Sequence, residues 1–276
     1  MEHLKTYGSP ALVNLAWRLR SRLSSIIDDV WSWETVSESL AVLGKTRQEL
    51  LAAAAASQCV CNGDWYEYVM SNFRANSIDV RGLCRDVYTA ICEGRTPTTP
   101  LVVLAGARGG EGKSVFLKAL WSVYGSENVF PTPAKSNYPL LDLETKKVAF
   151  LDEYRFSAAV LPYAIQCLWF DGSVVPIARP QNVQGVTGHG MYKGTAPVFI
   201  TTKDQDLKRL EKAAADDPET GLPGSGDASM LLRRLKVYRF TTRVPKPERR
   251  LPYCGRCFAQ LIVEGGGGDA AQVDWF

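Results

Sequence analysis

Apolar residues in the first third of the chain recur with the period of an α-helix. The first such run is predicted within residues 10–30, and further helices are predicted at 35–43 and 47–56. The apolar positions of the first run are Leu12, Leu15, Leu19, Leu23, Ile26, Ile27 and Val30.

Two more helices are predicted before residue 95. Asp64 can cap an aromatic-rich helix, and Ser77 or Asp79 can cap a helix that ends near Gly94. The pattern therefore predicts an N-terminal helical bundle over residues 1–95. This bundle would serve either for self-association or as a plain supporting domain.

The pattern changes after the Thr- and Pro-rich segment 95–100, which is expected to be a linker. Strand-length apolar runs then alternate with helical segments, which predicts an α/β fold with a mainly parallel sheet flanked by helices. Strands are expected at 101–105, 148–152, 174–178, 197–202 and 236–240, and helices at 113–123, 158–169 and 204–215. The expected domains are 1–95, 96–245, and 246–276 with a C-terminal helix and a flexible tail.

A glycine-rich loop follows the first predicted strand and leads into a predicted helix. It has the form Ala107-x4-Gly112-Lys113-Ser114, with alanine at the position of the usual first glycine. Glycines let backbone N–H groups turn inward around phosphate oxygens, and a helix N-terminus favours an anion. We expect a P-loop in which Lys113 reaches the β- and γ-phosphates of ATP and Ser114 holds Mg²⁺. The expected nucleotide-binding residues are Ala107, Arg108, Gly109, Gly110, Glu111, Gly112, Lys113, Ser114 and Val115.

Two carboxylates follow the next predicted strand, at Asp152 and Glu153. Charged groups at the end of a buried strand must be paired or bind a metal. After a P-loop they indicate a Walker B motif, in which Asp152 holds Mg²⁺ and Glu153 polarises the attacking water. A solvated acidic pair is the alternative interpretation.

Composition adds limits to this picture. The chain has 276 residues, of which 46% are hydrophobic and 22% charged, so it is globular. The net charge of +3 predicts that any contact with nucleic acid depends on a local patch. Without a membrane-length apolar run or a secretory leader, an intracellular setting with no membrane partner is expected.

The seven cysteines contain two closely spaced pairs, Cys59-x-Cys61 and Cys254-x-x-Cys257. Together the pairs offer four zinc ligands, but a one-residue spacing is unusual and the chain has only two histidines. The sequence therefore favours free thiols over zinc. A thioredoxin-type role for the second pair is disfavoured, since no βαβ pattern follows it.

The order and spacing of five segments resemble the superfamily 3 helicases, the hexameric AAA+ motors of parvovirus and circular single-stranded DNA virus replication proteins. The segments are the P-loop, KKVAFLDEYRF, FDGSVVPIAR, APVFITT and LLRRLKVYRF. The resemblance covers about residues 95–245, and the helices before it fit the family's N-terminal collar. The resemblance implies a ring-forming homo-hexamer that hydrolyses ATP with Mg²⁺ and moves along single-stranded DNA.

In that family a hairpin after the Walker B strand points into the channel of the ring. Here it corresponds to residues 172–194, where Arg179, His189 and Lys193 would contact phosphates and Tyr192 would stack on a base. A glycine-rich loop with ordinary surface charges is the alternative.

The family's next strand ends in a polar sensor, usually asparagine, whereas this chain has Lys203. Thr201 or Thr202 could still position the lytic water, and Lys203 could contact the γ-phosphate. An ordinary surface lysine is the alternative, and the departure leaves the efficiency of hydrolysis open.

Arg234 matches the family's arginine, which would reach the ATP of the neighbouring subunit. Arg233 is the second candidate, and a pair of solvated arginines is the alternative.

The His-apolar-His motif of the family's nicking endonuclease is missing, since the chain has only His3 and His189. We therefore expect no nicking activity and a separate nicking initiator as partner. In a eukaryotic or viral replication setting, the expected location is the nucleus. Two other functions stay open. One is a different P-loop motor, for packaging or transposition, and the other is a nucleotide-gated assembly protein that hydrolyses ATP poorly.

Overall fold

The computed structural model describes residues 44–180, 190–215, 226–245 and 251–267, together with the single residues Arg18, Arg22, Ser25 and Val42. By its contacts the chain divides into two compact units, residues 1–45 and residues 46–276. The helices predicted before residue 44 lie outside the described residues apart from these single positions.

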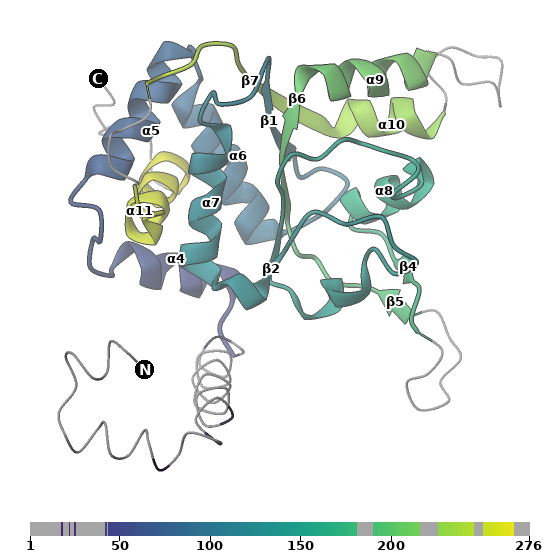
Figure 1. The fold of residues 1–276 in the computed structure, drawn as a ribbon, viewed down its shortest axis with the longest axis horizontal. Helices are drawn as coiled ribbons and strands as arrows, with labels where there is room; N and C mark the ends of the chain where they lie inside the picture. Colours follow the sequence, from purple (N-terminus) through teal and green to yellow (C-terminus); the bar gives the residue numbers. More distant parts are fainter. Residues whose placement is uncertain are drawn as a thin grey trace. The chain divides into compact units, whose positions relative to one another are not determined.

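A five-stranded, wholly parallel sheet forms the centre of the second unit (Figure 1). Its order is β2-β3-β6-β1-β7. The strands are β1 (Leu101–Gly106), β2 (Val129–Phe130), β3 (Val148–Leu151), β6 (Val198–Lys203) and β7 (Leu235–Phe240). The predicted α/β class is confirmed. Strand β2 was missed because two residues carry no periodic signal.

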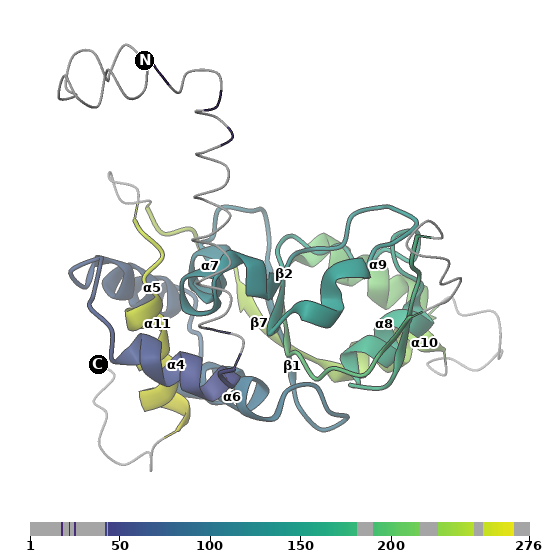
Figure 2. The same cartoon turned by 90° about the horizontal axis from the view of Figure 1, so that it is seen from below.

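Helices cover both faces of this sheet (Figures 1 and 2). One face carries α8 (Tyr163–Phe170), α9 (Asp204–Ala215) and α10 (Asp227–Arg234). The other carries α7 (Lys113–Tyr124), whose Trp121 ring packs edge-on against Phe150 of β3. Because both faces are covered, β1 and β3 are apolar and buried at every position.

Beyond α7 lies a layer of helices drawn from both ends of the unit. It holds α4 (Arg47–Ala55), α5 (Asp64–Ala75), α6 (Val80–Glu93) and α11 (Gly255–Gly266), and α11 packs on α4, α6 and α7. The predicted cap Asp79 is confirmed, since its carboxylate accepts from Gly82 N–H. The predicted cap Asp64 is wrong, because it is the first residue of α5 and Gly63 precedes it as N-cap. The domain boundaries predicted at 95 and 245 stay predictions.

The strand expected at 174–178 does not join the main sheet. It forms β4 (Val175–Ile177), which pairs antiparallel with β5 (Gly190–Tyr192) as a separate hairpin. The helix expected from 158 begins only at Tyr163, after Pro162. Among the described residues, no helix has both the length and the apolar character needed to cross a membrane.

Candidate functional site

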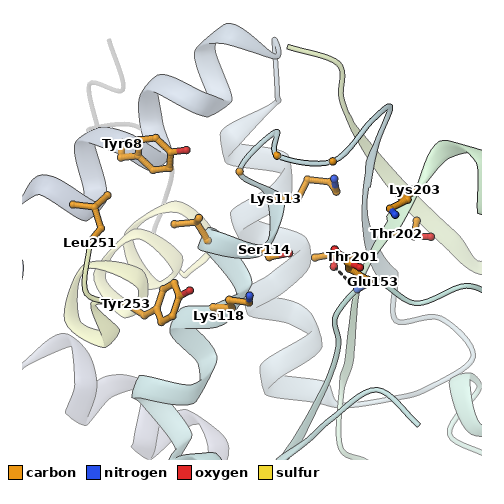
Figure 3. A pocket seen from close by; sticks show the side chains of 14 residues that line it. Tyr68, Lys113, Ser114, Lys118, Glu153, Thr201, Thr202, Lys203, Leu251 and Tyr253 are labelled. Atoms are coloured by element: carbon orange, nitrogen blue, oxygen red, sulfur yellow. Dashed lines mark hydrogen bonds between the residues drawn. The ribbon is translucent and has the colours of Figure 1, made fainter. Parts of the chain in front are cut away.

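The strand order brings three strand ends to one edge. Strand β6 lies between β1 and β3, so the carboxyl ends of these strands are neighbours. In open α/β sheets, ligands bind outside this edge. A pocket of about 470 Å³ lies here (Figure 3). Its lining is Tyr68, Gly109, Gly110, Gly112, Lys113, Ser114, Val115, Lys118, Glu153, Thr201, Thr202, Lys203, Leu251 and Tyr253.

The glycine-rich loop connects β1 to α7 along this pocket. Gly109, Gly110 and Gly112 have φ values of 89°, 82° and 82°, which side chains rarely tolerate. A Cβ at Gly112 would also lie 2.0 Å from Asn72 Nδ2. Gly112 is the N-cap of α7 and supplies no side chain to the first N–H groups of that helix. The loop therefore has a backbone conformation that requires glycine at these positions.

The side chain of Glu111 turns inward and bonds to the backbone of this loop. Its carboxylate accepts from Arg108 N–H at 2.6 Å and Gly109 N–H at 2.8 Å, and it lies 2.9 Å from Lys113 Nζ. Burial raises the pKa of Glu111, but the bonds from Lys113 and the backbone outweigh burial and lower the pKa overall. Glu111 thus shapes the loop and holds Lys113, a role that the sequence analysis did not assign.

Asp152 joins the predicted Walker motifs. Its Oδ1 accepts from the hydroxyls of Ser114 at 2.5 Å and Thr201 at 2.6 Å, and Lys118 Nζ lies 3.2 Å from Oδ2. Burial raises the pKa of Asp152, but the bonds from Ser114 and Thr201 and the charge of Lys118 outweigh it, so the carboxylate stays ionised. The two predicted Mg²⁺ ligands, Ser114 and Asp152, are therefore in contact. Sequence reasoning missed Lys118, although it lies five residues after Lys113 on the same helix.

Glu153 lines the pocket in a strained conformation. Its φ of 52° is rare for a non-glycine residue, and strain of this kind gathers at functional sites. The Thr201 hydroxyl accepts from Glu153 N–H at 2.9 Å (Figure 3). The hydroxyl of Thr202 instead donates to the Tyr154 carbonyl at 2.6 Å, so Thr201 is the better candidate to act beside the carboxylates. Lys203, at the end of β6, lines the pocket as well.

A second wall of the pocket was absent from the sequence analysis. Tyr68 of α5 and the pair Leu251 and Tyr253 lie across the pocket from Glu153 (Figure 3). Tyr253 is held from outside, where its carbonyl accepts from Ser122 Oγ at 2.6 Å. Aromatic rings far apart in sequence carry no local signal of a shared site.

Arg234 lies at the amino ends of the strands, opposite the ends that carry the pocket. It precedes β7, whose first residue Leu235 pairs with Leu101, the first residue of β1. Its guanidinium makes a two-pronged ion pair with Asp171, with Nη2 at 2.5 Å from Oδ2. Arg234 therefore lies away from the pocket of its own chain, and Arg233 is exposed beside it.

The four residues predicted to contact DNA differ in their placement. Arg179 pairs with Glu144 at 2.5 Å, and Lys193 is exposed next to β5. His189 lies outside the described residues. Base stacking by Tyr192 is contradicted, because the residue is 3% exposed and the Arg95 guanidinium lies over its ring at 5.0 Å from the centroid. The predicted linker is anchored by the same contact, since Arg95 is itself buried.

The two cysteine pairs meet in space. Cys59 Sγ lies 3.6 Å from Cys61 Sγ and 3.6 Å from Cys257 Sγ. All four sulfurs, with that of Cys254, lie within 4.8 Å of one another. All four cysteines are free, as the sequence analysis favoured, but that analysis did not expect the two pairs to meet in one four-sulfur cluster.

Comparison with protein-family models and with curated proteins found no match. Among solved structures, the A form apo structure of the NrS-1 C-terminal region aligns with a TM-score of 0.44 at 15% identity, over 69% of this chain and 43% of that one. A second A form structure of the region gives 0.41 at 14% identity, covering 71% and 41%. A third apo structure gives 0.42 at 15%, covering 71% and 42%. The chain spans less than half the length of these neighbours.

Proposed function

We propose that this chain is an ATP-dependent, Mg²⁺-requiring DNA helicase or translocase module that works as a ring. One observation carries the ATPase part of the proposal. The glycine loop with Lys113, the Ser114–Asp152 pair and the strained Glu153 converge on one pocket at the carboxyl edge of the sheet.

The loop and helix α7 would bind the phosphates. Backbone N–H groups at the start of α7 would face the phosphates, and Lys113 would add a positive charge. Because Glu111 now holds Lys113 at 2.9 Å, nucleotide binding would draw the ammonium toward the phosphates and leave Glu111 bonded to the loop backbone.

Ser114 and Asp152 present the oxygen ligands that Mg²⁺ prefers. Bound there, Mg²⁺ would neutralise charge on the β- and γ-phosphates. Glu153 would orient the attacking water and accept its proton, and Thr201 would hold both acidic residues in register through its single hydroxyl. Lys203 would stabilise charge on the γ-phosphate from the end of β6.

The aromatic wall would receive the base of the nucleotide. Tyr68 and Tyr253 offer ring faces, and Leu251 offers an apolar surface, on the side of the pocket away from Glu153. A planar purine stacks on such rings. The wall is open to any planar base, so we propose ATP from the family resemblance and not from a base-specific contact.

Ring formation and DNA tracking rest on the superfamily 3 resemblance. A homo-hexamer would bring Arg234 of one subunit to the ATP of the next, after Arg234 leaves Asp171. The β4–β5 hairpin would contact single-stranded DNA through Lys193 and Arg179, the latter after release from Glu144. A separate nicking initiator would supply the origin cleavage that this chain lacks the motif to perform.

ATP turnover with and without single-stranded DNA tests the proposal. Turnover stimulated by single-stranded DNA is expected, and both Lys113→Ala and Glu153→Gln should abolish it. Glu153→Gln should still bind nucleotide, because the loop is intact. Glu144→Gln, an exposed carboxylate away from the pocket, is the matched control and should keep basal turnover.

Two outcomes would replace the proposal, and a third would remove one residue from it. Stimulation by duplex but not by single-stranded DNA would indicate a packaging or transposition motor. ATP-driven oligomerisation without DNA-stimulated turnover would indicate the nucleotide-gated assembly protein, which the lysine at position 203 keeps open. Unchanged turnover in Glu153→Gln would refute the assignment of Glu153.

A further inference from the structure

Four cysteine sulfurs form a compact cluster away from the nucleotide pocket. Cys59 and Cys61 lie in the turn between α4 and α5, Cys254 is the N-cap of α11, and Cys257 lies in the first turn of α11. Residues three apart on a helix share a face, so the last two sulfurs point the same way. Two segments distant in sequence thus present two sulfurs each to one point.

The distances between the sulfurs have the size of a tetrahedral metal site. Four of the six sulfur pairs are separated by 3.6, 3.9, 3.6 and 3.5 Å, and all six lie within 4.8 Å. Four sulfurs at about 2.3 Å from a central zinc ion lie about 3.8 Å from one another in a regular tetrahedron. A disulfide would need about 2.05 Å, so these pairs are not bonded to each other. A multinuclear iron–sulfur cluster would spread its ligands around several metal atoms and hold them farther apart.

The surroundings of the cluster also suit a closed, structural site. Cys61, Cys254 and Cys257 are buried, with exposures of 4%, 1% and 8%. The turn after Cys61 is sharp, since Asn62 and Gly63 both have positive φ, and it folds the first pair back toward α11. Buried thiols packed only against one another would gain little, whereas four thiolates around one divalent cation compensate their charge.

We propose that Cys59, Cys61, Cys254 and Cys257 bind one structural zinc ion, which ties the α4–α5 turn to helix α11. All four ligand positions come from the protein, so the site holds no water for catalysis. Arg256, between the last two ligands, lines the hollow next to Cys59 and Cys257 and offsets the negative charge of a tetrathiolate site. The assignment is independent of the proposed function, because none of the four cysteines lines the nucleotide pocket.

Metal analysis of the 276-residue chain, purified without chelator, tests the proposal. About one zinc ion per chain is expected in the unmodified protein. Cys61→Ser and Cys257→Ser should each lower the zinc content about tenfold, because three ligands bind far more weakly than four. Cys92→Ser is the matched control, since Cys92 lies outside the cluster, and it should keep its zinc.

A variant that fails to fold would also lose zinc, so the unmodified chain supplies a second measurement. Exchange with Co²⁺ should give sulfur-to-cobalt charge-transfer bands and the visible bands of a tetrahedral site. The proposal would be overturned if the unmodified protein contained no metal after purification and gave none of these bands with Co²⁺. An intact mass that shows disulfides within the cluster would do the same, and stoichiometric iron in place of zinc would overturn the choice of metal.

Discussion

The Ser114 hydroxyl donates to Asp152 Oδ1 at 2.5 Å, although one residue follows β1 and the other follows β3. Both strands neighbour β6, so the residues after them share one edge of the sheet. Thr201 of β6 donates to the same oxygen and fixes its position. The expected cation site is therefore built from three adjacent strands.

Asp152→Asn should raise the Mg²⁺ concentration needed for half-maximal ATP turnover by at least about tenfold, since the amide keeps the shape but removes the charge. Initial rates over a Mg²⁺ titration measure this. Asp142→Asn, at an exposed acidic position, is the control and should leave the requirement unchanged. An unaltered requirement in Asp152→Asn would remove this carboxylate from the metal site.

The neighbouring threonines of β6 should respond differently to valine. Thr201→Val removes the hydroxyl that contacts both Asp152 and Glu153, so kcat should fall about tenfold with nucleotide affinity retained. Thr202→Val leaves the Tyr154 carbonyl unpaired, so it should lower the free energy of unfolding by about 1 kcal/mol with a smaller effect on kcat. Steady-state kinetics and chemical denaturation separate the two effects, and equal losses of kcat would contradict the distinction.

Glu111→Ala should destabilise the chain by about 3 kcal/mol, because it leaves the buried Lys113 ammonium and two backbone N–H groups without their acceptor. Glu144→Ala breaks a partly exposed pair with Arg179 and should cost less than about 1 kcal/mol. Equilibrium denaturation of the two variants makes the comparison. Similar values would mean that the Glu111–Lys113 pair is not a structural element of the loop.

Arg234→Ala and Lys113→Ala chains should each lack turnover alone but regain part of it when mixed. This follows if Arg234 completes the site of a neighbouring subunit, since a mixed ring contains some interfaces with both residues intact. Asp171→Asn, which releases Arg234 without removing it, is the control and should keep turnover. No recovery on mixing folded variants would refute action between subunits.

The sequence could predict the parts of this site that lie within one short segment. The glycine loop and the Asp152–Glu153 pair each follow a buried apolar strand, so pattern and position sufficed. It could not predict the inward turn of Glu111, because that depends on loop geometry. Nor could it predict the tyrosine wall, which combines α5 with a segment near the C-terminus.

The β4–β5 hairpin is a second case in which the sequence predicted the backbone but not the burial of a side chain. The superfamily 3 resemblance implied a hairpin within residues 172–194, and β4 pairs antiparallel with β5 there. Tyr192 is buried as part of the main hydrophobic core, and the guanidinium of Arg95, a residue of the supposed linker, lies over its ring. Side-chain burial set by a distant segment leaves no trace in a local pattern.

The cysteine cluster also sets an order of events during synthesis. Cys59 and Cys254 are 195 residues apart. At ordinary rates of translation, the first pair of thiols waits roughly 10 to 40 s for the second. Through that interval α4, α5 and α6 lack the helix that covers them. The nascent chain therefore carries unpaired cysteine ligands and an uncovered apolar layer until α11 has left the ribosome.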